Sequence, residues 1–487
     1  MILALLSGVM GVFAFAPYKL YPLAALSLMG LLLAWQKTHT AKQAFYRGLS
    51  FGIGYFGLGI HWVFISIYQF GHAPIMLSIL LTALLVIILA VFPALTGYCW
   101  NRFYPQRSWP SYLLAFPAIW CLGEWIRNWA FTGFPWLLIG DSQTNALFLG
   151  VAAVGGSALI GFILAQTAGL WAYAWQEKRY GWHVLYTLFL GALLYASNQI
   201  TWTHPIGKPI TVSLVQGNVE QSLKWEGNKA DQIYQTYLDL TEPIWSSDLV
   251  IWPEAAIPVP IPYANPWVNA LNEQAKAHHT TLLFGIPIRV DWAIYNGIHV
   301  VGDNQGEYWK RHLVPFGEFF PVPSISALIL RQLDIPMSHF NAGPLQQQNI
   351  KLDQLSIAHY ICYEIAFASE VRSSLDNASL IITISDDAWF GHSNAQAQQL
   401  QMAQMRAMEN GRPLLSATNN GLTAIVNAQG QITHQLEPFS TGVLTAQVQG
   451  LEGQTFWSKH GIDVVLLLSI VSLLMGKYKT TTSGDLL

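Results

Sequence analysis

The sequence LSIAHYICYE, residues 355–364, decides the fold of the polar part of this chain. The residues before the cysteine are mostly apolar, which predicts a short buried β-strand over 355–362 with Cys362 at its end. Cys362 is the only thiol of the polar part, because Cys99 and Cys121 fall in apolar runs. A lone thiol has no disulfide partner there, so a nucleophile is our leading interpretation. A small core residue is the ordinary alternative.

The composition of the chain is that of a membrane protein. Of its 487 residues, 52% are hydrophobic and only 10% are charged, whereas soluble domains carry about 25% charged residues. The net charge of -3 and the lack of a basic run give no indication of nucleic-acid binding. Most of the charge falls in residues 201–460. The composition therefore predicts a polar domain enclosed by membrane-spanning segments.

About eight apolar stretches approach the length of about 20 residues that a bilayer requires. We expect a polytopic α-helical membrane domain of about seven helices over residues 1–200, and a C-terminal transmembrane helix with a cytoplasmic tail over residues 459–487. The first stretch should be retained rather than cleaved, because no Lys or Arg precedes it. The predicted spans are residues 2–16, 20–36, 48–68, 75–100, 110–129, 145–175, 182–199 and 461–476.

The short loops predict the orientation of these spans. Lys or Arg residues occur in the loops 36–47, 101–109 and 176–181, and again after the last span. With eight spans, all four segments lie on one side, which the positive-inside rule assigns to the cytoplasm. The polar domain over residues 201–458 is therefore expected on the outer side of the membrane.

Within residues 201–458, short apolar stretches alternate with polar helical ones, which predicts a layered α/β domain. A helix is expected over Ala395–Asn410, and a hairpin over 425–432 with its turn at Asn427-Ala428-Gln429-Gly430. The other predicted strands are residues 209–215, 248–252, 281–285, 299–302, 355–362 and 380–385.

Three ionisable residues of the polar domain stand near predicted strand ends. Glu254 follows the strand over 248–252, Lys310 begins the segment KRHLVPFGE, and Cys362 ends its own strand. A thiol needs a base or a nearby cation to act as a nucleophile near neutral pH. Glu254 is a candidate general base, and Lys310 is a candidate to stabilise a thiolate and an oxyanion.

Glu318 and Glu364 are candidates to support this chemistry. Either carboxylate could orient Lys310 or Glu254, or pass a proton to a leaving group. Each motif alone has an ordinary explanation, since a Glu after Pro usually begins a helix and a Lys in a loop is usually solvated. Their occurrence together favours acyl transfer through a covalent intermediate.

Glu254, Lys310 and Cys362, in this order, are similar to the Glu-Lys-Cys triad of the nitrilase superfamily. With the predicted spans on both sides, the whole chain resembles the apolipoprotein N-acyltransferases, a family of bacterial lipoprotein maturation enzymes. Asp386 departs from the family pattern, in which we expect Asn. The segments that carry the resemblance are 216–218, 224–225, 313–318, 387–391 and 412–421.

The resemblance implies a nitrilase-like αββα sandwich for residues 201–458 and a ping-pong reaction. In this reaction Cys362 attacks the sn-1 ester of a phospholipid, typically phosphatidylethanolamine, and forms a thioester. The α-amine of the S-diacylglyceryl-cysteine at the N-terminus of an apolipoprotein then takes the acyl chain. Glu254 is implied as the base and Lys310 as the oxyanion stabiliser, with no metal and no cofactor. We expect a monomer in the bacterial inner membrane, with the catalytic domain on the periplasmic side.

Trp225, Tyr363 and Trp389 are candidate substrate-binding residues. Trp225 matches a tryptophan near the active site of the family, although an interfacial anchor is an equal alternative for it. Residues 319–344 contain an unusually apolar stretch for an outward domain. We expect this stretch to be a lid that dips into the outer leaflet, with a core-packed loop as the alternative.

Two other functions fit part of the pattern. A membrane-anchored nitrilase-like amidase acting on a small amide would use the same triad, but hydrolysis requires neither eight spans nor an apolar lid. A transporter or receptor with an outward sensor domain would call for polar groups in its spans, and these hold few charges. Glu124 and Arg127, spaced i, i+3 in one span, are expected to form a structural pair.

Overall fold

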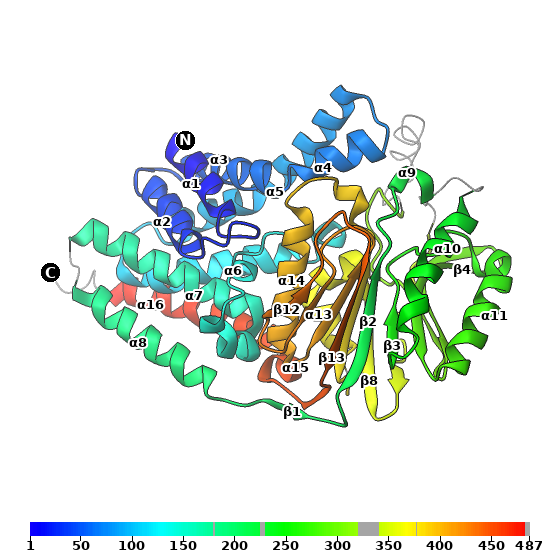
Figure 1. The fold of residues 1–487 in the computed structure, drawn as a ribbon. Helices are drawn as coiled ribbons and strands as arrows, with labels where there is room; N and C mark the ends of the chain where they lie inside the picture. The colour runs from blue at the N-terminus through cyan, green and yellow to red at the C-terminus, as the bar shows by residue number, and fades with distance from the viewer. Residues whose placement is uncertain (179–180, 225–228, 320–339, 376, 483–487) are drawn as a thin grey trace. The chain divides into compact units, whose positions relative to one another are not determined.

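The computed structural model describes residues 1–178, 181–224, 229–319, 340–375 and 377–482 (Figure 1). The chain divides into two compact units. The first comprises Met1–Phe64, Met76–Thr201 and Thr455–Leu487, and the second comprises Ile65–Ile75 and Trp202–Gln454. The short stretch Ile65–Ile75 therefore belongs with the polar second unit, although it precedes a long apolar helix.

The first unit is helical, and every predicted span overlaps one of its helices. Among the described residues, two helical segments, Ile75–Phe103 and Ala146–Glu177, are long and apolar enough to cross a membrane by themselves. The total of eight spans stays a prediction, because the other apolar helices are shorter or bent. The helices are α1 (Ile2–Val12), α2 (Leu23–Gln36), α3 (Ala41–Gly59), α4 (Trp62–Ile65), α5 (Ile75–Phe103), α6 (Phe116–Arg127), α7 (Leu149–Glu177), α8 (Gly181–Asn198), α15 (Phe456–His460) and α16 (Asp463–Thr482).

The span predicted over 48–68 is not one straight helix. α3 ends at Gly59, and the chain bends by 53° before α4 and the π-helix η1 (Ser66–Phe70). Apolar residues run through the bend without a Pro or a charge, so the hydropathy pattern gives no sign of it. If the pair formed one span, it would be the third segment able to cross a membrane.

The pair predicted from the spacing of Glu124 and Arg127 is confirmed in α6. Their charged groups are 3.9 Å apart. Arg127 also donates to the main-chain oxygen atoms of Phe134 and Trp136 at 2.8 and 2.6 Å, and Glu124 accepts the N–H of Ile139 at 2.9 Å. The pair therefore binds the irregular segment that follows α6.

The second unit contains two six-stranded sheets in the orders β13-β2-β3-β4-β5-β6 and β12-β11-β10-β9-β8-β7, and a small sheet of β1 and β14. The strands are β1 (Thr203–Pro205), β2 (Ile210–Gln216), β3 (Leu249–Ile251), β4 (Thr281–Val290), β5 (Ala293–Gly302), β6 (Gly306–Trp309), β7 (Ile350–Leu352), β8 (Leu355–Ile361), β9 (Leu380–Ser385), β10 (Leu414–Thr418), β11 (Ala424–Val426), β12 (Ile432–Gln435), β13 (Gly442–Val448) and β14 (Leu451–Gly453). The helices are α9 (Gln221–Lys224), α10 (Ala230–Thr241), α11 (Ile261–Ala277), α13 (Ala368–Ser373) and α14 (Ala395–Asn410).

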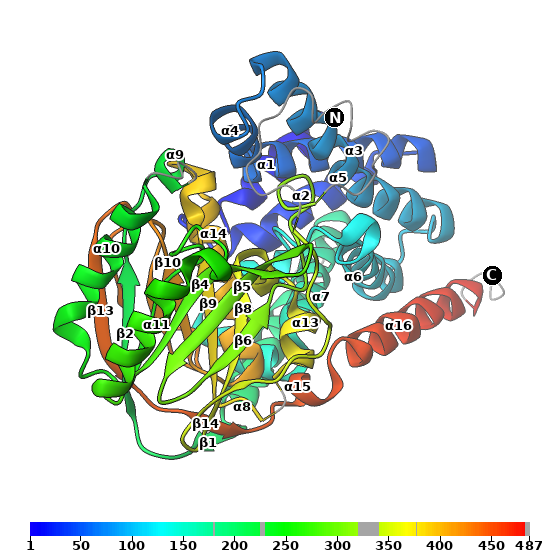
Figure 2. The same cartoon turned by 90° about the vertical axis from the view of Figure 1, so that its right-hand side faces the viewer.

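The two large sheets pack face to face, and helices cover their outer faces. Between the sheets, Ile251 and Leu283 of one sheet and Ile357 and Ile382 of the other belong to a single buried core. α10 and α11 close a second core on the first sheet, and α13 and α14 close a third on the second sheet. The layers therefore follow the order helix, sheet, sheet, helix, as expected for a nitrilase-like sandwich (Figures 1 and 2).

Several parallel strands end at the same edge of this sandwich. β3 lies parallel between β2 and β4, and β9 lies parallel between β8 and β10. The last residues of β3, β8, β9 and β10 are Ile251, Ile361, Ser385 and Thr418. Asp386, the residue after β9, donates its N–H to the carboxylate of Glu254 at 2.8 Å. Glu254 follows β3, so the ends of the two sheets meet. Residues that follow these strands are thus gathered in one place.

The strands predicted from the sequence all lie on observed strands. The helix predicted over Ala395–Asn410 is confirmed at both ends, and β11 and β12 form the predicted hairpin. β4 and β5 are longer than predicted, because their antiparallel ladder continues to Val290 and Ala293. The sequence did not predict β1, β6, β7, β10, β13 and β14. In β6, β7 and β13 exposed or half-buried residues interrupt the apolar pattern, whereas β10 is fully buried and was missed all the same.

Ile382→Ala is expected to destabilise the second unit by about 2–5 kcal/mol, because it opens a cavity in the fully buried core between the sheets. Val290→Ala is the matched control, since Val290 is 42% exposed. Thermal unfolding of the detergent-solubilised chain, followed by tryptophan fluorescence, compares the two variants. Equal unfolding midpoints would contradict close packing of the sheets around Ile382.

Candidate active site

Cys362 has an unusual backbone conformation directly after β8. Its φ is +55°, in the left-handed region that residues with a Cβ seldom adopt. The turn Cys362–Ala366 is held by Glu364, whose carboxylate accepts the N–H of Ile361 at 2.7 Å. Backbone strain of this kind is often found at functional sites. The chain therefore leaves the strand direction at the thiol.

Lys310 lies between two carboxylates. Its Nζ is 2.9 Å from Glu318 Oε1 and 3.6 Å from Glu254 Oε1, and its side chain is 1% exposed. Burial lowers the pKa of Lys310, but the charges of Glu318 and Glu254 outweigh burial and raise the pKa above its ordinary value. The ammonium group therefore stays charged, as it must to stabilise an anion.

The carboxylate of Glu254 is held at both of its oxygen atoms. Oε1 accepts a hydrogen bond from Asn296 Nδ2 at 2.7 Å, and Oε2 accepts the N–H of Asp386 at 2.8 Å. Burial raises the pKa of Glu254, while the charge of Lys310 opposes this shift. A buried carboxylate with a raised pKa is suited to accept a proton near neutral pH.

The thiol of Cys362 is subject to the charges of this cluster. Burial raises the pKa of Cys362 and the charge of Glu254 raises it further, whereas Lys310 lowers it. The resting thiol is therefore protonated and needs a base to become a nucleophile. The structure thus brings together Glu254, Lys310, Glu318 and Cys362, which are four of the five catalytic and supporting residues predicted from the sequence.

The fifth, Glu364, lies in a different environment. Its carboxylate accepts the hydroxyl of Tyr308 at 2.8 Å and the N–H of Arg311 at 2.7 Å. Within the described part of the chain it makes no hydrogen bond to Lys310 itself. Because Tyr308 and Arg311 flank Lys310 along the chain, Glu364 joins the lysine segment to the turn that begins at Cys362. Its carboxylate therefore sets the position of the lysine relative to the thiol.

Tyr363 is buried beside the thiol, with its ring centroid 5.0 Å from that of Phe367. Its ring packs within the protein, and a substrate contact for it stays a prediction. Trp225 and residues 320–339, which form most of the predicted lid, lie outside the described residues. Phe319 is the first residue of that lid, and its main-chain oxygen accepts the N–H of Phe316 at 2.8 Å.

Trp389 contacts the short stretch Ile65–Ile75 within the second unit. Its main-chain oxygen accepts the hydroxyl of Ser66 at 2.7 Å, and its ring centroid is 6.0 Å from that of Phe70. The turn Asp387–Phe390 that carries Trp389 follows β9 after one residue, Asp386. Trp389 is therefore placed at the same edge as the cluster around Cys362, and its contact with substrate stays a prediction.

Comparison with known proteins identifies the family. The family model described as apolipoprotein N-acyltransferase N-terminal domain matches residues 7–170, and the model described as carbon-nitrogen hydrolase matches residues 211–455. The apolipoprotein N-acyltransferase of Coxiella burnetii is 38% identical over 479 residues, which cover 96% of this chain and 99% of the relative. The enzyme of Shewanella oneidensis is 38% identical over 497 residues, covering 98% and 95%. This chain belongs to the apolipoprotein N-acyltransferase family.

The family membership makes the protein an acyltransferase with a nitrilase-like domain. Among solved structures, a carbon-nitrogen hydrolase superfamily protein from Xanthomonas campestris aligns with 50% of this chain and 91% of its own, at 18% identity and a TM-score of 0.40.

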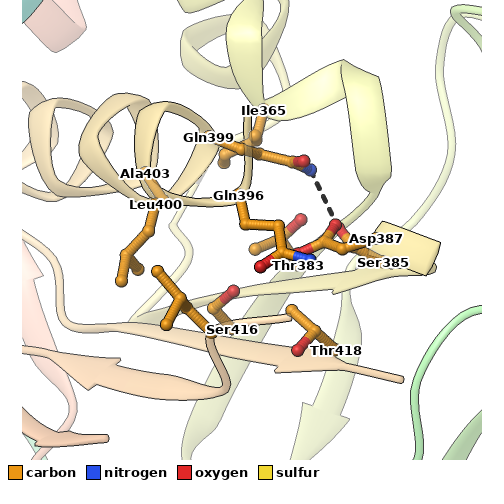
Figure 3. Close-up of a pocket in the computed structure, with 11 residues that line it drawn as sticks. Ile365, Thr383, Ser385, Asp387, Gln396, Gln399, Leu400, Ala403, Ser416 and Thr418 are labelled. Carbon is orange, nitrogen blue, oxygen red and sulfur yellow. Dashed lines mark hydrogen bonds between the residues drawn. The ribbon is translucent and has the colours of Figure 1, made fainter. Parts of the chain in front are cut away.

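Figure 3 shows a small polar cavity of this acyltransferase. Thr383, Asp387 and Gln399 are among its lining residues. Gln399 Nε2 is 2.9 Å from Ser385 Oγ and 3.9 Å from Cys362 Sγ, so this amide links the cavity to the thiol. The cavity has room for about one water molecule. It is therefore too small to hold an acyl chain.

Asn296 is a site residue of the acyltransferase that sequence reasoning misses. It is almost fully buried, and its Nδ2 donates both to Glu254 Oε1 at 2.7 Å and to Glu318 Oε1 at 2.8 Å. One amide group thus holds two carboxylates that would otherwise repel each other. The only sequence signal is an Asn within the stretch that forms β5, and this signal does not distinguish a site residue from a surface position.

Gly285→Ala is expected to lower the acyltransferase rate by about 10²-fold, because a Cβ at this position would lie 2.6 Å from the Cα of Glu254 and from Pro253 O. Both contacts are with main chain, so the main chain of Glu254 must move. Gly306→Ala is the control, since its Cβ would meet only the side chain of Ile350 at 3.5 Å. Initial rates at equal amounts of folded protein compare the variants, and equal rates would show that Glu254 tolerates displacement.

Proposed function

We propose that this chain transfers the sn-1 acyl chain of a phospholipid to the α-amine of the N-terminal S-diacylglyceryl-cysteine of an apolipoprotein, by a ping-pong reaction through a thioester on Cys362. The proposed donor is phosphatidylethanolamine. The observation that carries the proposal is the buried cluster of Glu254, Lys310 and Glu318 around the thiol. Near full-length similarity to apolipoprotein N-acyltransferases supports the same conclusion.

In the first half-reaction, Glu254 takes the proton from the thiol of Cys362. The sulfur attacks the carbonyl carbon of the ester, and Lys310 stabilises the negative charge that develops on the carbonyl oxygen. When the ester C–O bond breaks, Glu254 returns the proton to the leaving oxygen. The lysophospholipid departs and the acyl chain remains as a thioester on Cys362.

In the second half-reaction, the amine of the apolipoprotein attacks the thioester carbonyl. Glu254 accepts a proton from the amine nitrogen, the C–S bond breaks, and an amide is formed. The sulfur leaves as a thiolate beside Lys310 and recovers its proton from Glu254. Glu318 keeps the ammonium group in place throughout, since it lies 2.9 Å from Lys310 Nζ.

The apolar helices support a membrane location. We propose a multi-pass protein of the inner membrane with about eight spans, a membrane domain over residues 1–200, a periplasmic catalytic domain over 201–458, and a last span with its tail over 459–487. The positive charges of the short loops support this orientation. A monomer with a single site per chain is sufficient for the reaction.

Substrate contacts are proposed for Trp225, Tyr363 and Trp389. The closeness of Tyr363 and Trp389 to the end of β8 and β9 supports the latter two. An acyl donor and a lipidated acceptor both reside in the membrane, so the lid over residues 319–344 is proposed to admit them from the lipid phase.

A labelled donor tests this function directly. Purified protein incubated with phosphatidylethanolamine labelled in its sn-1 chain should acquire a hydroxylamine-sensitive label, which persists until a diacylated lipopeptide is added. Cys362→Ser should abolish this label, and Cys99→Ser, a change in an apolar helix, should leave it intact. Absence of the label from the unchanged protein, or rapid turnover of a small soluble amide in place of transfer, would contradict the proposal.

The pH dependence of acylation provides a second prediction. Burial raises the pKa of Glu254 above its ordinary value of 4.5. The base acts only when deprotonated, so the rate should fall as the pH drops through this raised pKa. Single-turnover acylation between about pH 4 and 8 should therefore show an acid limb above pH 4.5. A limb at or below this value would mean that Glu254 is not the base.

A further inference from the structure

A second buried lysine lies behind the proposed base. Lys224, the last residue of α9, has a fully buried side chain, and its Nζ is 2.8 Å from Asp386 Oδ2. The side chain of Asp386 is 4% exposed. No step of the proposed acyl transfer uses either side chain. An ion pair so completely removed from water calls for an explanation beyond surface solvation.

The ion pair binds Glu254 from two directions. Lys224 Nζ donates to the main-chain oxygen of Glu254 at 3.2 Å, and the N–H of Asp386 donates to Glu254 Oε2 at 2.8 Å. The side chain of Lys224 thus holds the main chain of the proposed base, and the main-chain N–H of Asp386 holds its carboxylate. The orientation of Glu254 therefore depends on both members.

Asn419, directly after β10, ties the pair to two other segments. Its Nδ2 donates to Asp386 Oδ1 at 3.0 Å and to the main-chain oxygen of Val219 at 2.8 Å, while its Oδ1 accepts the N–H of Val219 at 3.0 Å. Val219 lies just before α9, the helix of Lys224. A single buried amide therefore positions both partners, as expected of a rigid support for a functional group.

The pair also determines the charge around Glu254. Buried ion pairs seldom add stability, because the cost of removing both charges from water is close to the energy of their attraction. Without Lys224, the carboxylate of Asp386 would add an unbalanced negative charge next to Glu254. Within the described residues, the charged or titratable groups that face this region are Lys310, Glu318, Cys362, Asp386, Asp387, Lys224 and Tyr237.

We propose that Lys224 and Asp386 are positioning residues for acyl transfer. Their ion pair fixes the two segments that hold Glu254 in place and cancels a negative charge beside its carboxylate. This inference rests on the proposed role of Glu254 as the base.

Single and double charge removal test the inference. In Lys224→Met, Asp386 keeps an unbalanced negative charge, so the pKa of Glu254 should rise and the acid limb of acylation should move to higher pH by about one unit. In Asp386→Asn, Lys224 keeps an unbalanced positive charge, so the limb should move to lower pH by a similar amount. The double variant has neither charge, and its limb should return close to that of the unchanged protein. A purely structural role would not shift the limb in opposite directions.

Both single variants should lower kcat for a phosphatidylethanolamine donor and leave its KM unchanged, because neither side chain is proposed to touch the phospholipid. Lys276→Met and Asp231→Asn make the same chemical changes at exposed positions of α11 and α10 and serve as controls. Should Lys224→Met fail to fold, Asp386→Asn and the double variant carry the test. The inference is supported if the acid limb of acylation moves to lower pH in Asp386→Asn and lies at its original pH in the double variant. It is overturned if the acid limb keeps its original pH in both of these variants.

Glu254→Gln separates this inference from the proposed function. If Glu254→Gln still forms the thioester at the unchanged rate, the proposed base is wrong and the positioning role fails with it. If Glu254→Gln is inactive, the acid limb of acylation decides the second question. Only the positioning role is overturned if this limb has the same pH in Lys224→Met, Asp386→Asn, the double variant and the unchanged protein.

Discussion

The candidate site is organised around the buried ammonium group of Lys310, which has almost no contact with water. A charge in this position is stable only if opposite charges and hydrogen bonds replace its hydration. Glu318 at 2.9 Å and Glu254 at 3.6 Å provide the charges. The two carboxylates repel each other in turn, and Asn296 reduces this repulsion by donating to both. The cation thus determines which polar groups the surrounding segments must supply.

The sandwich supplies these groups because its two sheets end at a common edge. Glu254 and Lys310 come from the sheet that contains β3 and β6, and Cys362 comes from the other sheet. Glu364 links the two sheets, because it follows β8 and accepts the hydroxyl of Tyr308 in β6. The apolar core between the sheets ends where this polar edge begins. A second ion pair, Lys224–Asp386, then supports Glu254 from behind.

Much of the local structure could be predicted from the sequence. Apolar runs such as 355–362 and 380–385 predict buried strands, and the breaker-free stretch Ala395–Asn410 predicts α14 with both of its ends. Half-exposed strands such as β6 and β13 lack this continuous apolar pattern. The bend after Gly59 also escapes prediction, since hydropathy records apolar character and does not record the direction of a helix.

The sequence by itself determined the residue types at the strand ends, the family resemblance, and Cys362, Glu254 and Lys310 as candidates. These depend on order and composition, which are local properties of the chain. Only the tertiary structure decided that Glu318 contacts Lys310 while Glu364 holds the turn that begins at Cys362. It also decided that Asn296 and Lys224 hold Glu254. Such contacts join residues far apart in the chain, and they exist because two packed sheets bring the ends of separate strands together. A buried charge finds its partner in space, so spacing along the chain does not reveal the pair.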